Sequence, residues 1–303
     1  MLHNKNVVIT GANGMLGTAF QQLLKTNAIP LSRKDCDVTN IDNVMKLEKY
    51  KPDVIIHCAA NVNADFCEKY PDQCKQTQVL GTKHIIKLAE KTNAVIFYPQ
   101  SFLIFDGTEK PIIEETKPNP LSYYGKFKLE AANLIQQNTD NHLIIQMGGF
   151  FGGYQVDKNF IGKFIPHVIK LIKQKVSSIE VGNRIWQPTF TNDLAKNSIE
   201  LLNQNKQGIY NMASHGQASF YDVAKACIEF LNLTNMIEII QVDARVVEKI
   251  ENAQRPSSAI LSNNKLISEG LDLQRNWRNS LHEYLTHPYF NNLIKNLNLS
   301  TLE

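Results

Sequence analysis

Hydrophobic and polar residues follow one another along the first half of the chain in blocks that fit short buried strands and amphipathic helices. Residues 6–10 are apolar and β-branched, as in a buried strand, and residues 15–24 have the apolar spacing of a helix. Similar blocks predict helices at residues 41–50, 78–92 and 122–137, and strands at residues 54–58, 95–98 and 142–147. Strands that alternate with helices build a parallel sheet with both faces covered.

Beyond residue 150 the pattern is less regular, although it still predicts a helix at residues 220–231 and a strand at residues 237–242. At 303 residues the chain also exceeds the usual size of one domain. We therefore expect an α/β protein with a Rossmann-type doubly wound parallel sheet built from residues 1–150, with further core segments after about residue 180. Residues 151–303 are expected to form mainly a smaller mixed α/β substrate-binding lobe, interleaved with the core.

Composition narrows the kinds of partner that the chain can have. Its 32 Lys and Arg against 29 Asp and Glu leave a net charge of +3, too small for a nucleic-acid-binding surface. No apolar run approaches the roughly 20 residues of a membrane helix. The five cysteines show no CxxC spacing and follow no secretory leader, so we expect reduced thiols in the cytoplasm and no metal site. His57, beside Cys58 on an apolar strand, is expected in the core.

The passage from the first strand into the first helix is rich in glycine. Glycines allow a tight turn there and let backbone N–H groups approach a pyrophosphate, while the N-terminus of the helix favours negative charge. The alternative is an ordinary strand-to-helix turn, but the position of the motif favours a dinucleotide site. The residues expected to hold the dinucleotide are Gly11, Asn13, Gly14, Met15, Leu16 and Gly17.

The residues that follow the second predicted strand bear on the choice of cofactor. That strand should end near Leu31, where the adenosine ribose of a dinucleotide would lie, and Ser32, Arg33 and Lys34 come next. An acidic residue would favour the free ribose of NAD, whereas arginine suits the 2′-phosphate of NADP, so NADP(H) is favoured over NAD(H). A solvated loop is the alternative. Asp37 and Val38 are then expected at the adenine edge.

Three polar residues are candidates for the chemistry. Tyr124 and Lys128 lie four residues apart, on one face of a predicted helix, and an ammonium near a phenol lowers its pKa. Ser101 follows a predicted strand, where its hydroxyl can hydrogen-bond a substrate carbonyl. Ligands of doubly wound sheets lie outside the carboxyl ends of the strands, so we expect Ser101, Tyr124 and the glycine turn to meet there.

These residues, together with several other motifs, resemble the dTDP-4-dehydrorhamnose reductases, a family within the extended short-chain dehydrogenases/reductases. The resemblance spans nearly the whole chain. It rests on the glycine motif, on Tyr124 to Lys128 as a YxxxK element, and on the following segments: Pro52-Asp53-Val54-Ile55-Ile56-His57-Cys58-Ala59-Ala60, Phe105-Asp106-Gly107, Gln187-Pro188-Thr189, Asp193-Leu194-Ala195, and Arg255-Pro256 preceding Leu261.

The resemblance implies hydride transfer from NADPH to carbon 4 of a nucleotide-linked 4-keto-6-deoxyhexose. Tyr124 would be the proton donor, Lys128 would bind the ribose and Ser101 would orient the carbonyl. The resemblance also leaves a homodimer open. It adds Cys58, Ala59 and Ala60 to the cofactor site, and it implies a substrate pocket that includes Asn61, Phe102, Gly149, Asn159, Gln187 and Arg255.

The sequence departs from the family pattern where the family contacts its sugar. In the family, an aspartate and a tyrosine follow closely after the serine, but here Ser101 is followed by Phe102 and neither residue is present. Gly149 stands where the family has a tryptophan, and the residues after Ala60 also differ from the family pattern. Such clustered replacements favour a sugar other than rhamnose. Two further functions stay open. One is a regulatory role like that of the β subunit of methionine adenosyltransferase, and the other is epimerisation of a keto sugar with tightly held NAD.

Overall fold

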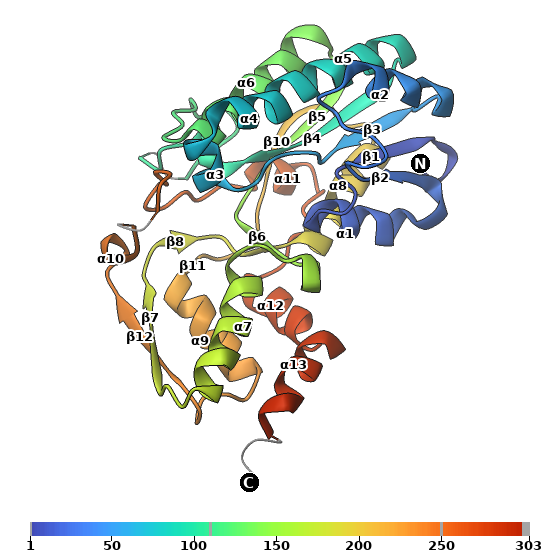
Figure 1. The fold of residues 1–303 in the computed structure, drawn as a ribbon. Coiled ribbons are helices and arrows are strands. Elements are labelled where there is room, and N and C mark those ends of the chain that lie inside the picture. Colours follow the sequence, from blue (N-terminus) through green and yellow to red (C-terminus); the bar gives the residue numbers. More distant parts are fainter. Residues whose placement is uncertain (1, 109–110, 249–250, 299–303) are drawn as a thin grey trace.

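Six largely apolar runs form one parallel sheet in the order β2-β1-β3-β4-β5-β10. The structure is a computed structural model, and it describes residues 2–108, 111–248 and 251–298. The sheet lies in the upper part of the molecule in Figure 1. Its strands are β1 (Val7–Thr10), β2 (Ala28–Leu31), β3 (Val54–His57), β4 (Val95–Ser101), β5 (His142–Met147) and β10 (Gly208–Met212).

Helices cover both faces of this sheet (Figure 1). Within β1, Val7 and Ile9 pack among the residues of one face and Val8 among those of the other, because successive side chains of a strand point to opposite sides. The first face is covered by α1 (Met15–Leu24), α8 (Thr191–Asn203) and α11 (Asn264–Ser268), and the second by α2 (Ile41–Met45), α5 (Gly81–Thr92) and α6 (Tyr123–Asn138). Two short helices, α3 (Ala64–Lys69) and α4 (Pro71–Lys75), follow β3.

The strand order reverses at β1, which has β2 on one side and β3 on the other. In doubly wound sheets such a reversal opens a crevice at the carboxyl ends of the two diverging strands, and nucleotides bind there. Here that crevice lies between Gly11, which follows β1, and Cys58, which follows β3.

The lower part of the molecule has its own hydrophobic core. Tyr284, Phe151 and Phe190 lie in it, and their rings contact one another. The core is enclosed by α7 (Phe160–Lys173), α9 (Phe220–Phe230), α12 (Trp277–Leu285), α13 (Pro288–Asn298) and the parallel pair β7 (Ser178–Gly182) and β12 (Glu238–Val242), after which α10 (Ala244–Glu248) follows.

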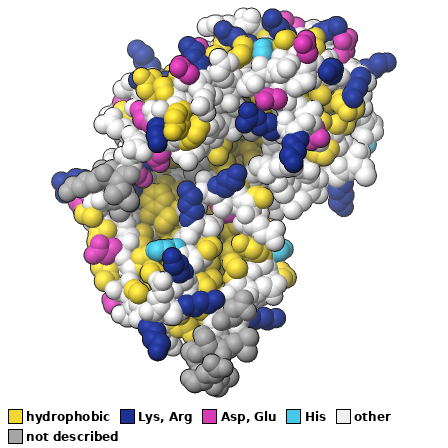
Figure 2. Space-filling view, in the orientation of Figure 1, with side chains coloured by type: hydrophobic (Ala, Val, Ile, Leu, Met, Phe, Trp, Pro, Cys, Tyr) yellow, Lys and Arg dark blue, Asp and Glu magenta, His cyan; other side chains and the backbone are white. Residues whose placement is uncertain are grey.

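Two short strand pairs lie between the parts. They are β6 (Phe150–Phe151) with β9 (Thr189–Phe190), and β8 (Ile185–Trp186) with β11 (Ala218–Ser219). Figure 2 shows the molecule hollowed between its upper and lower parts, with hydrophobic side chains along the hollow.

The predicted fold class is confirmed, and most predicted elements lie within a residue or two of the observed ones. The helix at residues 15–24 and the strand at 142–147 agree to the residue, and β2 ends at Leu31 as expected. Among the described residues, no helix has both the length and the apolar character needed to cross a bilayer.

The clearest difference is β4, which continues past the predicted end at Tyr98 as far as Ser101. The residue after Tyr98 is Pro99, and proline cannot donate to a ladder. In the structure β4 pairs with β3 only from Val95 to Phe97, so at Pro99 that edge of the strand has no neighbour that requires a donor. The extension makes Ser101 part of the sheet and not of a loop.

Two predicted helices also differ. The helix expected at residues 41–50 changes at Lys46 from an α-helix into a 3₁₀-helix, which ends at Tyr50. The one expected at 78–92 begins with a π-helical turn, Gln76–Leu80.

Candidate active site

The turn after β1 has room for glycine and for no larger residue. Gly11 has a φ of +65°, and a Cβ atom there would lie 2.6 Å from the backbone nitrogen of Ala59. A Cβ atom on Gly17 would lie 2.5 Å from the carbonyl oxygen of Gly11. Because the neighbours are backbone atoms, a side chain at either position would force the strand ends and the helix apart. The glycine pattern therefore lets β1, β3 and α1 approach one another closely.

The first turn of α1 has the features of an anion site. Its N-cap is Gly14, and no side chain caps the free N–H groups of the turn. Met15 and Leu16 are buried and fix the helix to the sheet, whereas Asn13 is exposed beside them. Uncapped N–H groups at the crevice of a doubly wound sheet suit a pyrophosphate, so these residues fit a dinucleotide.

The loop after β2 carries two cations, Arg33 and Lys34, and two carboxylates, Asp35 and Asp37. The Arg33 side chain is 85% exposed and only loosely paired, with its Nε 3.4 Å from Asp37. Ser32 donates its hydroxyl to Asp35 at 2.6 Å, and its backbone N–H points to the same carboxylate. Both hydrogen bonds lower the pKa of Asp35. A phosphate near Ser32 would thus meet a negative neighbour, and Arg33 is free to turn toward it.

Four more predicted cofactor residues lie along the same crevice. Val38 is buried against Gly81 of α5. Cys58, Ala59 and Ala60 follow β3 and are half-buried. The Cys58 N–H donates to the carbonyl of Thr10, which continues the sheet pairing as far as the glycine turn. Burial raises the pKa of Cys58 to about 12, so its thiol stays neutral.

Ser101 and Tyr124 meet at the carboxyl end of β4. Ser101 is the last residue of that strand, and Tyr124 lies in the first turn of α6, whose N-cap Ser122 accepts a hydrogen bond from Gly125. Burial raises the pKa of Tyr124, and a hydrogen bond with Ser101 lowers it by less. The phenol is therefore neutral and lies next to the serine hydroxyl, as expected of two groups that act on one carbonyl.

Lys128 lies one turn further along α6 and is buried. Its Nζ donates to the carbonyl oxygen of Pro99 at 2.6 Å and lies 3.8 Å from the centre of the Tyr98 ring. Burial lowers the pKa of Lys128 to about 7. The lowered pKa expected for Tyr124 is not found, because burial dominates and the ammonium is turned toward the strand.

Two thiols that no sequence motif assigned to the site pack against Tyr124. Cys67 and Cys74 are fully buried, and both pack with Tyr124 and Ala253 in one small cluster. The Gln78 side chain donates to Cys74 at 3.0 Å and lies 3.9 Å from the Cys67 sulfur. Their seven-residue spacing matches no known motif, so only the fold brings them together.

Two of the predicted substrate residues meet a third that was not predicted. A Cβ atom on Gly149 would lie 3.6 Å from the Phe102 ring, but only 2.6 Å from Cε3 of Trp186. The indole of Trp186 thus fills the space that a side chain at position 149 would take. No motif pointed to Trp186, since it comes from a separate short strand, β8.

The other predicted substrate residues are held by the protein itself. The Gln187 amide bonds both backbone groups of Leu261, at 2.7 and 3.1 Å. Asn159 donates to the Phe150 carbonyl at 2.7 Å, and the Asn61 side chain accepts from the N–H of Asn63 at 3.2 Å. Each of these side chains therefore has a structural partner near the hollow.

Arg255 takes part in an ion-pair network across that hollow. Its guanidinium bonds both carboxylate oxygens of Asp65, at 2.7 and 3.3 Å, and lies 3.1 Å from Glu251. Glu251 also bonds Arg184 at 2.7 Å. The network joins α3, which follows β3, to the segment before β8 and to the 251–255 segment, whose Ala253 packs on Tyr124.

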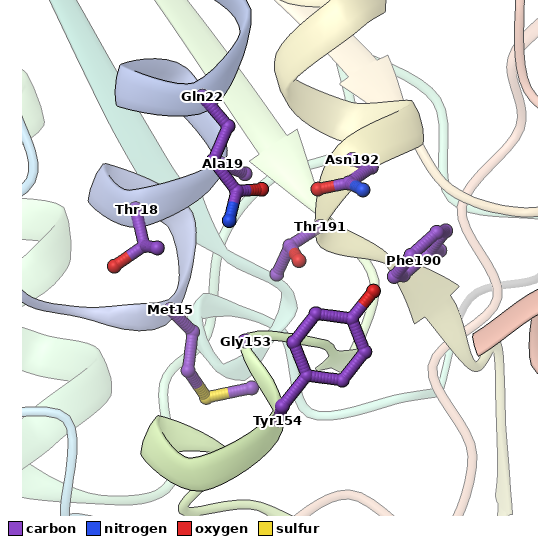
Figure 3. Close-up of a pocket in the computed structure, with 9 residues that line it drawn as sticks. All are labelled: Met15, Thr18, Ala19, Gln22, Gly153, Tyr154, Phe190, Thr191 and Asn192. Carbon is purple, nitrogen blue, oxygen red and sulfur yellow. The ribbon is translucent and has the colours of Figure 1, made fainter. Parts of the chain in front are cut away.

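A narrow crevice lies on the other side of the glycine turn, where α1 meets the loop after β6. Figure 3 shows Tyr154 and Gly153 facing Met15 of α1, with Thr191 at the start of α8 beside them. The crevice is too narrow to admit a water molecule, and neither Ser101 nor Tyr124 lines it. The crevice is a packing seam and not the place of the chemistry. Across the described residues, no three or more His, Cys, Asp or Glu residues lie together as a metal site would require.

The fold and the site together define a Rossmann-type nucleotide-binding protein with the serine, tyrosine and lysine of a reductase. A family model described as the RmlD substrate binding domain matches residues 5–290. The chain belongs to this family, that of the dTDP-4-dehydrorhamnose reductases, and the resemblance inferred from the motifs is confirmed.

Two curated relatives differ in role. The spore coat polysaccharide biosynthesis protein SpsK of Bacillus subtilis (strain 168) is 28% identical over 284 residues, which cover 92% of this chain and 96% of that protein. Methionine adenosyltransferase 2 subunit beta of Bos taurus is also 28% identical, over 302 residues that cover 93% of this chain and 87% of that protein. Membership of the family is therefore compatible with more than one function.

Solved structures agree over almost the whole chain. A dTDP-4-dehydrorhamnose reductase from Clostridium acetobutylicum ATCC 824 has a TM-score of 0.84 and 30% identity, covering 93% of this chain and 98% of that one. The enzyme of the same name from Bacillus anthracis str. Ames, solved in complex with NADP, has a TM-score of 0.84 and 26% identity, covering 93% of this chain and 99% of that one.

Proposed function

We propose that the protein is an NADPH-dependent reductase that acts on the 4-keto group of a nucleotide-linked 4-keto-6-deoxyhexose. The observation that carries the proposal is that Ser101 and Tyr124 lie side by side at the carboxyl end of β4. Lys128 lies one turn further along the same helix. Serine, tyrosine and lysine so arranged can bind, protonate and position a carbonyl beside a dinucleotide.

The glycine turn would hold the pyrophosphate, and Arg33 would turn from Asp37 to the 2′-phosphate. Because Arg33 is exposed and loosely paired, that turn costs little. The preference for NADP over NAD rests on this cation and is supported by the NADP-bound relative. NADPH, when bound, supplies the hydride.

Tyr124 would protonate the carbonyl oxygen as it becomes an alkoxide, and Ser101 would hold that oxygen by a second hydrogen bond. A phenol with a raised pKa keeps its proton at neutral pH, as an acid must. Lys128 would bind the ribose hydroxyls. With a pKa near 7 it can also gain and lose a proton near neutral pH.

The decisive experiment is NADPH oxidation, followed by absorbance, with dTDP-, UDP- and GDP-linked 4-keto-6-deoxyhexoses as substrates. The expected result is turnover of one sugar by the native chain and none by the Tyr124→Phe variant. Equal rates in both proteins would contradict the proposed mechanism. No turnover of any sugar, despite tight binding of NADPH, would contradict the reductase proposal.

The second candidate is a regulatory subunit, and the match to methionine adenosyltransferase 2 subunit beta over 93% of the chain favours it. Such a protein would bind a methionine adenosyltransferase catalytic subunit and change its kinetics. Co-purification of the two proteins, with a shifted KM for methionine, would support this role. An intact Ser101 and Tyr124 pair favours the reductase, because a purely regulatory surface has no use for it.

A further inference from the structure

An aromatic wall, formed by Trp186 and Phe102, lies beside the proposed catalytic pair of Ser101 and Tyr124. Ser101 lies opposite Met147 in the sheet, and the two residues that follow Met147 lead to Gly149. The ring of Trp186 lies directly over Gly149, and Phe102, the neighbour of Ser101, touches the same point. The indole therefore stands at the carboxyl ends of β4 and β5, where a substrate of Ser101 must lie.

The wall is held rigidly from behind. The indole stacks on Phe220 at 4.9 Å between ring centres, with 12° between the planes, and Phe160 meets Phe220 edge-on at 4.8 Å. The backbone of Trp186 also pairs with Ala218 in β8 and β11. A ring that is stacked on one face and anchored through a paired backbone keeps its position when a ligand arrives, which is what a selective pocket wall requires.

The indole N–H makes no hydrogen bond with the part of the chain that the structure describes, although its nitrogen is buried. Trp186 as a whole is only 6% exposed. Buried tryptophans usually find a partner for this group, since an unpaired donor is costly. A phenylalanine would fill a purely structural position without that cost. The unpaired donor is a cost that the larger aromatic ring has to offset, and the Cε3 edge of that ring is the part that lies over Gly149.

We propose that Trp186 is a specificity-determining residue of the sugar pocket. The apolar face of the hexose packs on the wall formed by Trp186 and Phe102, and the Cε3 edge of the indole, which a phenylalanine would lack, extends that wall over Gly149. This inference rests on the proposed function, because it concerns the pocket of the same site. It explains why position 149 is a glycine: the aromatic surface comes from another strand and needs that space.

The chain holds only two tryptophans, so fluorescence can test the proposal without any turnover. Trp277 begins α12 within the core of the lower part, where it packs near Gly216. In a Trp277→Phe variant the emission comes from Trp186 alone, and in a Trp186→Phe variant it comes from Trp277. Each variant also carries Tyr124→Phe to prevent reaction, and each is saturated with NADP⁺.

The probes are the dTDP-, UDP- and GDP-linked 4-keto-6-deoxyhexoses, with the free nucleoside diphosphates as controls. The expected result is that one sugar nucleotide quenches Trp186 emission and the free diphosphate does not. Trp277 emission should stay unchanged. In the otherwise native enzyme, Trp186→Phe should raise the KM for that sugar about tenfold and leave the KM for NADPH within about twofold.

Gly149→Ala provides a second test that keeps the indole. Its Cβ atom would displace the ring, so the KM for the sugar should rise as in Trp186→Phe, with Trp277→Phe as the unaffected control. Turnover of a sugar without sugar-dependent quenching, and with an unchanged KM in Trp186→Phe, would overturn the inference and leave the reductase standing. Quenching without turnover of any sugar would overturn the reductase and leave the inference standing. Absence of both would overturn both.

Discussion

The Nζ atom of Lys128 lies 2.6 Å from the carbonyl oxygen of Pro99, beneath the strand that carries Ser101. A buried carbonyl only partly replaces the water that a free ammonium binds, and for this reason burial lowers the pKa of Lys128 from 10.5 to about 7. The contact connects the protonation of the site with the stability of the fold.

That connection predicts a pH dependence of stability. Between pH 7 and 10.5 the unfolded chain binds more protons at Lys128 than the folded chain, so the contribution of this residue to stability rises with pH. Below pH 7 the full cost of the buried charge remains. Relative to Lys128→Met, the wild type should gain up to about 1.4 kcal/mol in free energy of unfolding for each pH unit from 7 to 9. Urea unfolding at pH 7 and at pH 9 measures this gain.

The control is Lys126→Met, at an exposed position of the same helix. A difference between wild type and Lys128→Met that stays constant with pH would contradict the prediction.

The glycine turn predicts a different effect for two glycines of similar backbone conformation. Gly11 and Gly270 have φ values of +65° and +68°, so alanine costs about 1 kcal/mol of strain at either. Only at Gly11 would the new Cβ atom meet backbone, 2.6 Å from Ala59, whereas nothing lies within 4 Å of Gly270. Gly11→Ala should weaken NADPH binding more than tenfold in calorimetry, and Gly270→Ala should leave it unchanged. Equal affinities would place the cofactor elsewhere.

Adjacent tyrosines on α6 allow a matched test of the acid. Tyr124 is buried beside Ser101, and Tyr123 is exposed. Tyr124→Phe should reduce kcat by at least about 100-fold and leave NADPH affinity within a few-fold, since the phenol acts on the substrate. Tyr123→Phe should keep the full rate. Steady-state kinetics with the sugar nucleotide that the native chain reduces provides both numbers, and a slow Tyr123→Phe with a fast Tyr124→Phe would reverse the assignment.

The exposed position of Arg33 leads us to expect a preference for NADPH over NADH. Arg33→Ala should weaken NADPH more than NADH, because only NADPH carries the 2′-phosphate. Arg245, also exposed and paired with a nearby aspartate, is the control whose replacement by alanine should change neither affinity. Fluorescence titration of both nucleotides measures the ratio. If the affinities for NADPH and NADH fall equally, Arg33 does not bind the 2′-phosphate.

Replacing Gln187 is expected to lower the stability of the fold. Its amide satisfies the N–H and the carbonyl of Leu261, and Gln187→Ala leaves both buried groups unpaired. The free energy of unfolding should fall by about 2–4 kcal/mol. Gln204→Ala removes an exposed amide and should change it by less than about 0.5 kcal/mol. A stable Gln187→Ala with a raised KM for the sugar would instead make Gln187 a substrate residue.

The sequence predicts the sheet well because its strands are short, apolar and separated by helices of clear period. The prediction fails where local chemistry and tertiary pairing disagree. Pro99 reads as the end of a strand, yet β4 continues through it, since β3 pairs no further than Phe97. The place of β10 in the sheet could not be predicted either, because the sequence of a five-residue strand does not specify which strand it pairs with.

The site is predictable as far as its motifs reach. The glycine turn, Ser101 and Tyr124 come together as their positions after the strands suggest. The state of Lys128 could not be predicted, because the direction of a long side chain depends on which carbonyl lies nearby. Trp186 was missed for a similar reason: only the fold shows that its ring occupies the space beside Gly149.

Strand β10 (Gly208–Met212) has a consequence for synthesis on the ribosome. It pairs with β5 through all five of its residues, so β5 remains an open edge until residue 212 has left the ribosome. Unpaired edges invite wrong partners, and the nascent sheet must avoid them while some sixty further residues are added. For the same reason a single cut near residue 150 does not separate the two parts of the molecule, because the sheet would then lose its last strand.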